Sequence, residues 1–182
     1  MENKVLLDSE LLNITINRLC YQLIENHNSF EHTVIIGVQP RGIYLSQRIH
    51  ERLAEITQNN SIKHGLLDIT FHRDDFRRRD ELLVPSVTDV DFVIEDKNVI
   101  LIDDVLYTGR TIRAALDAIL AFGRPRHVEL LCLIDRKFSR ELPVQADYVG
   151  TSVDAITSQK VKVKWKEQDG VDEVLLIQTK DK

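Results

Sequence analysis

Apolar positions in the first three quarters of the chain repeat with either helical or strand spacing. Apolar residues recur every three or four positions in three segments, which predicts helices over 9–26, 45–56 and 111–122. Short apolar runs, largely β-branched, predict strands over 33–38, 64–71, 98–102 and 127–134. Strands that alternate with helices form a mostly parallel sheet with helices on both faces, so we expect the α/β fold class.

The pattern changes after residue 135. Val161, Val163 and Trp165 alternate with lysines, and Asp169-Gly170 is typical of a turn before a last strand over 172–178. We therefore expect a small C-terminal hood, about 136–182, that contains an antiparallel hairpin and belongs to one domain spanning 1–182. The charged stretch 72–91 has no periodicity, which is typical of a solvated loop.

Composition indicates an ordinary folded domain, because the 182 residues are 43% hydrophobic and 29% charged. The net charge of −5 argues against non-specific nucleic-acid binding, but a local basic patch remains compatible with it. No apolar run is long enough to span a bilayer, and the first residues lack a signal-peptide pattern, so we expect a cytoplasmic protein. Cys20 and Cys132 lack metal-ligand spacing and are expected to be packed thiols.

The segment 99–111 carries the candidate chemistry. A buried strand ends in Asp103 and Asp104, and a turn containing Thr108 and Gly109 then opens a helix. Ligands of open α/β sheets bind beyond the carboxyl ends of strands, and a helix N-terminus favours phosphate. The acids would repel phosphate, so we expect them to face hydroxyls or a metal. A phosphorylated sugar fits both requirements, whereas the acid pair alone would also suit an acidic pocket or a helix cap.

These residues resemble the phosphoribosyl pyrophosphate (PRPP) signature of type I phosphoribosyltransferases. The sequence Asp-Asp-Val-Leu-Tyr-Thr-Gly-Arg-Thr is most similar to that of the PyrR family, which combines pyrimidine-operon attenuation with uracil phosphoribosyltransferase activity. Further blocks resemble that family's pyrophosphate loop, flexible loop and base-binding hood, at 37–45, 67–75, 140–143 and 146–150. Ordered blocks along nearly the whole chain are more specific than one signature.

The resemblance implies that uracil and PRPP react to give UMP and pyrophosphate. It assigns catalytic roles to Asp103, Asp104 and Arg41, since carboxylates near the ribose stabilise the positive charge that develops there. Magnesium is expected to arrive with PRPP rather than in a site built by the protein. The stretch 72–91 would then be a lid that excludes water. The expected substrate-binding residues are Gln39, Pro40, Arg41, Gly42, Arg73, Asp103, Asp104, Val105, Leu106, Tyr107, Thr108, Gly109, Arg110, Thr111, Arg136 and Val161.

Two alternatives remain open. The hood segment 135–143 has one more residue than the family's Asp-Arg-Gly-His-Arg-Glu-Leu-Pro and lacks its Gly-His pair, so another base is a possible substrate. The other alternative is an RNA-binding attenuation regulator with a vestigial enzyme site, whose partner would be a pyrimidine operon leader RNA. Arg18, Arg140 and the lysines at 160, 162, 164 and 166 are candidates for RNA contact, although the lysines also suit a solvated strand face. The family further implies a homodimer or homotetramer.

Overall fold

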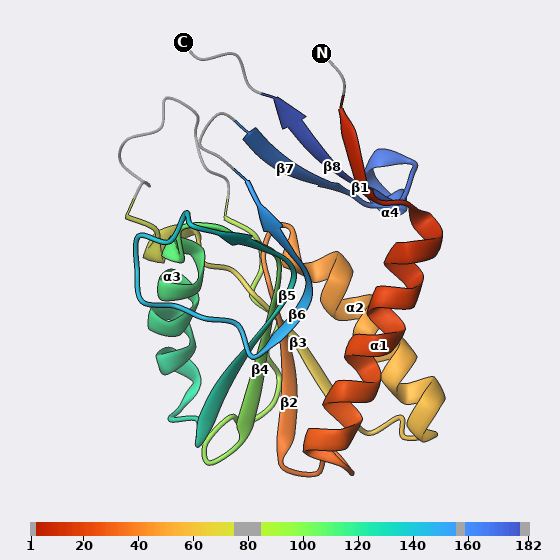
Figure 1. Ribbon diagram of the computed structural model, residues 1–182. Helices are drawn as coiled ribbons and strands as arrows, with labels where there is room; N and C mark the ends of the chain where they lie inside the picture. Colours follow the sequence, from red (N-terminus) through yellow and green to blue (C-terminus); the bar gives the residue numbers. More distant parts are fainter. Residues whose placement is uncertain (1–2, 75–84, 156–158, 179–182) are drawn as a thin grey trace.

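The computed structural model describes residues 3–74, 85–155 and 159–178, which form two β-sheets and their covering helices (Figure 1). The larger sheet is parallel, in the order β3-β2-β4-β5-β6, and the smaller is antiparallel, in the order β1-β8-β7. The strands are β1 (Lys4–Leu7), β2 (Thr33–Val38), β3 (Lys63–Leu67), β4 (Asn98–Leu106), β5 (His127–Lys137), β6 (Tyr148–Asp154), β7 (Gln159–Lys164) and β8 (Glu173–Gln178). The helices are α1 (Ser9–His27), α2 (Gly42–Thr57), α3 (Arg110–Ile119) and α4 (Lys166–Asp169), with short 3₁₀ turns η1 (Thr70–His72) and η2 (Leu120–Phe122).

Alternating side chains of the larger sheet fill two separate apolar cores. On β4, Ile100 and Ile102 join the core beneath α1 and α2, whereas Val99 and Leu101 join the core beneath α3. This follows from the two-residue period of a strand, because each face of a sheet covered on both sides must be apolar. The predicted α/β class with helices on both faces is therefore confirmed (Figure 1).

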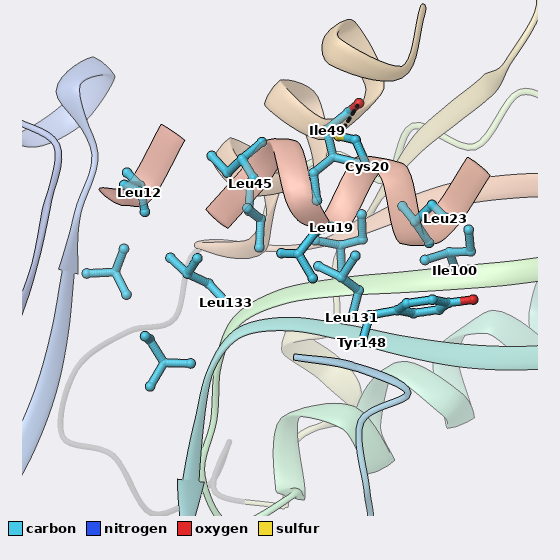
Figure 2. Packing of buried hydrophobic residues seen from close by; sticks show 14 of the residues in the cluster. Leu12, Leu19, Cys20, Leu23, Leu45, Ile49, Ile100, Leu131, Leu133 and Tyr148 are labelled. Carbon is cyan, nitrogen blue, oxygen red and sulfur yellow. Dashed lines mark hydrogen bonds between the residues drawn. The ribbon is translucent and has the colours of Figure 1, made fainter. Parts of the chain in front are cut away.

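Figure 2 shows the core beneath α1 and α2, where leucines of α1 meet side chains of β4 and β5. Leu19 and Leu23 are fully buried there, as is Cys20, whose thiol lies 3.8 Å from the carbonyl oxygen of Ile49. Cys20 and Cys132 are both free and buried, and burial raises the pKa of the Cys20 thiol to about 12. The prediction of packed thiols is confirmed.

Local capping sets where α1 and α3 begin. The Asp8 carboxylate, at the N-cap of α1, accepts a hydrogen bond from the Leu11 N–H at 2.9 Å. Gly109 precedes α3 with φ +92°, a left-handed conformation that glycine adopts without steric cost. Helix α3 can therefore start at Arg110, immediately after the acid-bearing strand.

The strand bounds differ from the sequence prediction in two places. Strand β4 continues to Leu106 instead of ending at 102, because its later residues still pair with β5. Strand β3 ends at Leu67, and the rest of the predicted strand over 64–71 includes η1. Asp103 and Asp104 are therefore the sixth and seventh of the nine residues of β4.

The small sheet also differs from the predicted hood. The hairpin of β7 and β8 is confirmed, but β1 from the N-terminus completes the sheet by pairing with β8. Within the expected hood range 136–182, β6 instead pairs with β5 at the edge of the larger sheet, where Tyr148 is buried. The small sheet lies over the end of the larger sheet at which the parallel strands finish (Figure 1). In the part of the chain that the structure describes, no helix is long and apolar enough to cross a membrane.

Candidate active site

Asp103 and Asp104 lie side by side near the end of β4, and both are buried, with exposures of 6% and 8%. The backbone N–H of Asp104 donates to Asp103 Oδ1 at 2.9 Å. Burial and the neighbouring Asp104 charge raise the pKa of Asp103 well above its ordinary value. Burial also raises the pKa of Asp104, against the opposing effect of the Arg41 guanidinium. Such a pair favours ligands that donate hydrogen bonds or carry positive charge.

A cavity of about 240 Å³ joins one of these acids to the turn before α3. Its walls bring together most of the residues predicted from the segment 99–111. The lining residues are Arg73, Asp103, Val105, Leu106, Tyr107, Thr108, Gly109, Arg110, Thr111 and Ile112. Backbone N–H groups at the start of α3 favour an anion, and Asp103 favours hydroxyls, so the cavity suits the phosphorylated sugar expected from the sequence.

Residues of the segment 140–142 brace this turn, a role that the sequence did not reveal. The Thr108 carbonyl oxygen accepts hydrogen bonds from the backbone N–H groups of Glu141 and Leu142, at 3.0 and 3.1 Å. Arg140 donates to the carbonyl oxygens of Leu106 and Tyr107. Backbone pairing of this kind depends on the folded path of the chain, so no residue pattern could have indicated it. The turn is thus held in shape before any ligand binds.

The predicted pyrophosphate loop packs directly against the acid pair. A Cβ atom at Gly42 would overlap the carbonyl oxygen of Ile102 and lie 3.0 Å from Asp103 Cα, so glycine allows this close approach. Pro40 is exposed and follows a cis peptide bond. The Gln39 side chain is turned away, because its amide donates to the Val87 carbonyl oxygen at 2.7 Å.

Arg41 connects the acid pair to the small sheet. Its Nε lies 3.3 Å from Asp104 Oδ2, and its Nη1 donates to Gln168 Oε1 at 2.8 Å. Nη2 donates to the Val163 carbonyl oxygen and lies 3.6 Å from Asp169 Oδ2. The guanidinium is therefore held between the end of β4 and α4, where Gln168 lies 127 residues beyond Arg41 in the sequence.

The two residues predicted to contact the base lie where β5 and β7 approach each other. The Arg136 guanidinium is buried with its Cζ 4.0 Å from the centroid of the Tyr107 ring, and it donates to the Gln159 carbonyl oxygen at 2.9 Å. Burial lowers the pKa of Arg136, and its Nε has no hydrogen-bond partner among the described residues. Val161 is buried in the core beneath α1 and α2. Its side chain is therefore not available to a ligand.

The candidate RNA-binding arginines both bind backbone carbonyl groups. Arg18 donates from α1 to the Gly150 carbonyl oxygen at 2.5 Å, and Arg140 braces the turn described above. Lys164 pairs with Glu173 across the hairpin at 2.5 Å, whereas Lys160, Lys162 and Lys166 are exposed. The lysines, more than the arginines, remain available to a nucleic acid.

The middle of the predicted lid, 75–84, lies outside the described residues. At its start, Asp74 forms ion pairs with Arg110 at 2.5 Å and Arg113 at 3.6 Å. After it, Leu66 and Asp89 form a β-bridge. Both flanks of the segment are therefore attached to the body of the domain, one on α3 and the other on β3. Among the described residues, no group of three or more acidic, histidine or cysteine side chains could hold a metal.

Comparison with known proteins agrees with this geometry. A family model described as phosphoribosyl transferase domain matches residues 2–168. A relative from Actinobacillus pleuropneumoniae serotype 5b, named "Bifunctional protein PyrR", is 43% identical over 178 residues, with 98% of each chain covered. Another of that name, from Desulfosudis oleivorans, is 46% identical over 170 residues, with 93% of each chain covered.

Solved structures agree in fold. The hypoxanthine phosphoribosyltransferase of Trypanosoma cruzi superposes with a TM-score of 0.71, 14% identity and 97% coverage of both chains. A hypoxanthine phosphoribosyltransferase of Staphylococcus aureus gives a TM-score of 0.69 at 19% identity, covering 97% of this chain and 91% of that one. The expected fold of this enzyme class is therefore confirmed.

Proposed function

The chain belongs to the PyrR family of phosphoribosyltransferases, and from that membership we propose that it transfers the phosphoribosyl group of PRPP to uracil. The bond between ribose C1 and the pyrophosphate oxygen breaks, the bond between C1 and uracil N1 forms, and the N1 proton is released. The products are UMP and pyrophosphate. One observation carries the proposal: Asp103 and the turn 108–111 line the same cavity.

The acid pair supplies the electrostatic part of the reaction. Positive charge develops on the ribose ring as pyrophosphate leaves, and ionised carboxylates beside the ring stabilise that charge. The turn 108–111 and the start of α3 bind the 5′-phosphate, which fixes the ribose above Asp103 and Asp104. Arg41, which pairs with Asp104, and Arg73, which lines the cavity with Asp103, would balance the charge of the leaving pyrophosphate.

The donor set also fits a magnesium ion that arrives with PRPP. Magnesium keeps several waters and is usually bound through one or two carboxylates together with substrate phosphates. Asp103 and Asp104 would provide carboxylate oxygens from neighbouring positions of β4, and a nearby cation would favour their ionised forms against the burial that raises their pKa values. When bound, the ion would neutralise charge on the pyrophosphate.

The base is recognised at the junction of β5 and β7. Uracil has two carbonyl acceptors and an imide donor, which the Arg136 guanidinium and backbone groups near Val161 can match. Arg136 is buried, and its Nε–H has no hydrogen-bond partner among the described residues. A hydrogen-bond acceptor on the ligand would remove the energetic cost of leaving this buried group unpaired. A competition assay with uracil, hypoxanthine and guanine as acceptors tests this choice of base.

The family membership extends the proposal to regulation. The relatives are named bifunctional, and we assign the second function to a UMP-responsive contact with a pyrimidine operon leader RNA. Exposed Lys160 and Lys162 on β7 and Lys166 on α4 are basic side chains available for such a contact. A gel shift with the leader transcript, with and without UMP, tests it, and no shift at micromolar protein would leave the enzyme alone.

The enzymatic proposal is tested with the double substitution Asp103→Asn/Asp104→Asn. Transfer of phosphoribose to labelled uracil should be lost, while Asp117→Asn, which removes an exposed carboxylate of α3, should retain it. Wild-type turnover by the double variant would refute the role of the acid pair. The expected cytoplasmic location and the dimer or tetramer remain predictions, and light scattering with and without PRPP tests the assembly.

A further inference from the structure

The guanidinium of Arg41 has partners on three of its sides. Toward the larger sheet, Nε lies 3.3 Å from Asp104 Oδ2. Toward the small sheet, Nη1 donates to Gln168 at 2.8 Å, and Nη2 meets the Val163 carbonyl oxygen and the Asp169 carboxylate. A guanidinium has five N–H groups in a fixed plane, so these contacts determine how the remaining edge is oriented. The side chain is still 33% exposed, so part of it remains accessible to a ligand.

The partners from α4 are themselves held in place. Asp169 Oδ2 accepts a hydrogen bond from the Trp165 backbone N–H at 3.0 Å, and the Gln168 backbone N–H donates to the Trp165 carbonyl oxygen at 3.0 Å. The Trp165 side chain is fully buried. The backbone that carries both polar side chains is therefore held in place. Through their contacts with Arg41, these side chains also restrain the position of the guanidinium beside Asp104.

We propose that Gln168 and Asp169 are positioning residues, which hold the Arg41 guanidinium beside Asp104 in the orientation that binds the pyrophosphate group of PRPP. The inference rests on the proposed function for the identity of the ligand. It adds that the small sheet takes part in donor binding, in addition to covering the base. Without these contacts Arg41 would keep only Asp104 and the Val163 carbonyl oxygen as partners, and its long side chain would lose more entropy each time it bound the ligand.

The neighbouring residue supplies a matched control. Glu167 also projects from α4, but it pairs with Arg48, with Arg48 Nη2 at 2.8 Å from Glu167 Oε2. Loss of that pair weakens attachment of α4 to α2 without touching Arg41. Gln168 is the better test position than Asp169, because Asp169 also caps the Trp165 backbone N–H.

The experiment measures PRPP binding by calorimetry with magnesium, together with steady-state kinetics, for the full-length protein. Gln168→Leu removes the acceptor for Arg41 and should weaken PRPP binding by about three- to tenfold, with the KM for uracil unchanged. Gln168→Glu keeps an acceptor and should remain within about twofold of wild type. Glu167→Gln should also bind PRPP within about twofold of wild type, even if its melting temperature falls.

Three outcomes would overturn the inference: wild-type PRPP affinity in Gln168→Leu, equal weakening in Gln168→Leu and Glu167→Gln, or equal changes in the KM values of both substrates. The calorimetric part of the test does not depend on turnover. If wild-type protein binds PRPP but forms no UMP, the proposed function fails, and the ratio of PRPP affinities still decides whether Gln168 positions Arg41. If wild-type protein does not bind PRPP at all, both proposals fail together.

Discussion

The end of β4 and the small sheet meet at Arg41, yet they are built in opposite ways. The first comes from one continuous segment, in which a buried strand, two acids, a turn and a helix follow each other within thirteen residues. The second is assembled from β1, β7 and β8, which lie at the two ends of the chain. The functional groups of the contiguous segment are held together by the sequence itself. The small sheet, in contrast, forms only if contacts between distant segments hold its strands in place. The two regions should therefore respond differently to substitution and to pH.

The largest expected effect is on the attachment of the small sheet. Trp165 is fully buried, with its ring 6.3 Å from that of Tyr44 and the Arg48 guanidinium 4.9 Å above it. Trp165→Ala should lower the free energy of unfolding by about 3–5 kcal/mol, measured by urea denaturation. Trp165→Phe should cost clearly less, because it keeps most of the apolar contact and removes an indole N–H that has no partner among the described residues.

Hydrogen exchange on Trp165→Ala sharpens the comparison. Amide protection should fall in β7 and β8 and persist in β2 and β4, since the core beneath α3 contains no residue of the small sheet. Equal loss of protection in both sheets would show that the regions unfold as one unit.

The next effect concerns the acid pair. Asp103→Asn should lower kcat/KM by about 10²–10³-fold, because a charge that stabilises the transition state is removed. The same variant should melt at a higher temperature than wild type at pH 7 without ligand. The folded-state pKa of Asp103 is raised by burial and by Asp104, so its contribution to stability is present at low pH and is lost as pH rises through that pKa.

Thermal melts of Asp103→Asn and wild type at pH 4 and pH 7 test whether the substitution raises or lowers stability at each pH. The stability gain should be larger at pH 7, where the unfolded wild-type chain is ionised and the folded one resists ionisation. A variant that is less stable at pH 7 would mean that Asp103 has a structural role, and the electrostatic account would be wrong.

Much of this site could be predicted because its residues are contiguous. The acid pair, the turn and the glycine before α3 stand next to each other, and the structure brings Asp103, the turn and the glycine into one cavity with Arg73. Strand β1 escaped prediction, since four residues before a helix cap show no clear alternation, and its Val5 is exposed. The partners of Arg41 also escaped, because Gln168 lies 127 residues away and a glutamine in a turn carries no pattern. Contacts of that kind are fixed by tertiary packing alone.

A smaller expected effect is a difference in the pH at which the two regions lose stability. His64 lies on β3, stacks on His50 with ring centroids 5.0 Å apart, and has its pKa lowered to about 4 by burial and by His50. The unfolded chain takes up this proton near pH 6.5, so the stabilising effect is present above that pH and is lost as pH falls toward 4. The loss is at most about 3 kcal/mol.

His64→Gln should therefore flatten the dependence of unfolding free energy on pH between 6.5 and 4, while His127→Gln, at an exposed position, should leave it unchanged. The stability of the small sheet should change only at lower pH. Hydrogen bonds from Arg48 lower the pKa of Glu167, so stability from that pair persists until pH falls below the ordinary value for glutamate. If His64→Gln kept the wild-type dependence of unfolding free energy on pH, the assignment of that dependence to His64 would be wrong.

The smallest effect tests how the two regions share the base site. Tyr107 belongs to the contiguous segment, and its ring lies 4.0 Å from Cζ of Arg136, which in turn binds the start of β7 through Gln159. Tyr107→Leu removes the π face and should raise the KM for uracil by about two- to fivefold, since such contacts contribute roughly 0.5–1 kcal/mol where they are partly exposed. Tyr107→Phe keeps the ring and should behave as wild type. In the proposed function the 5′-phosphate binds backbone groups of the neighbouring turn, so the affinity for PRPP should not change in either variant. Equal loss in both variants would instead assign the effect to the tyrosine hydroxyl, and Arg136 would then be oriented by the small sheet alone.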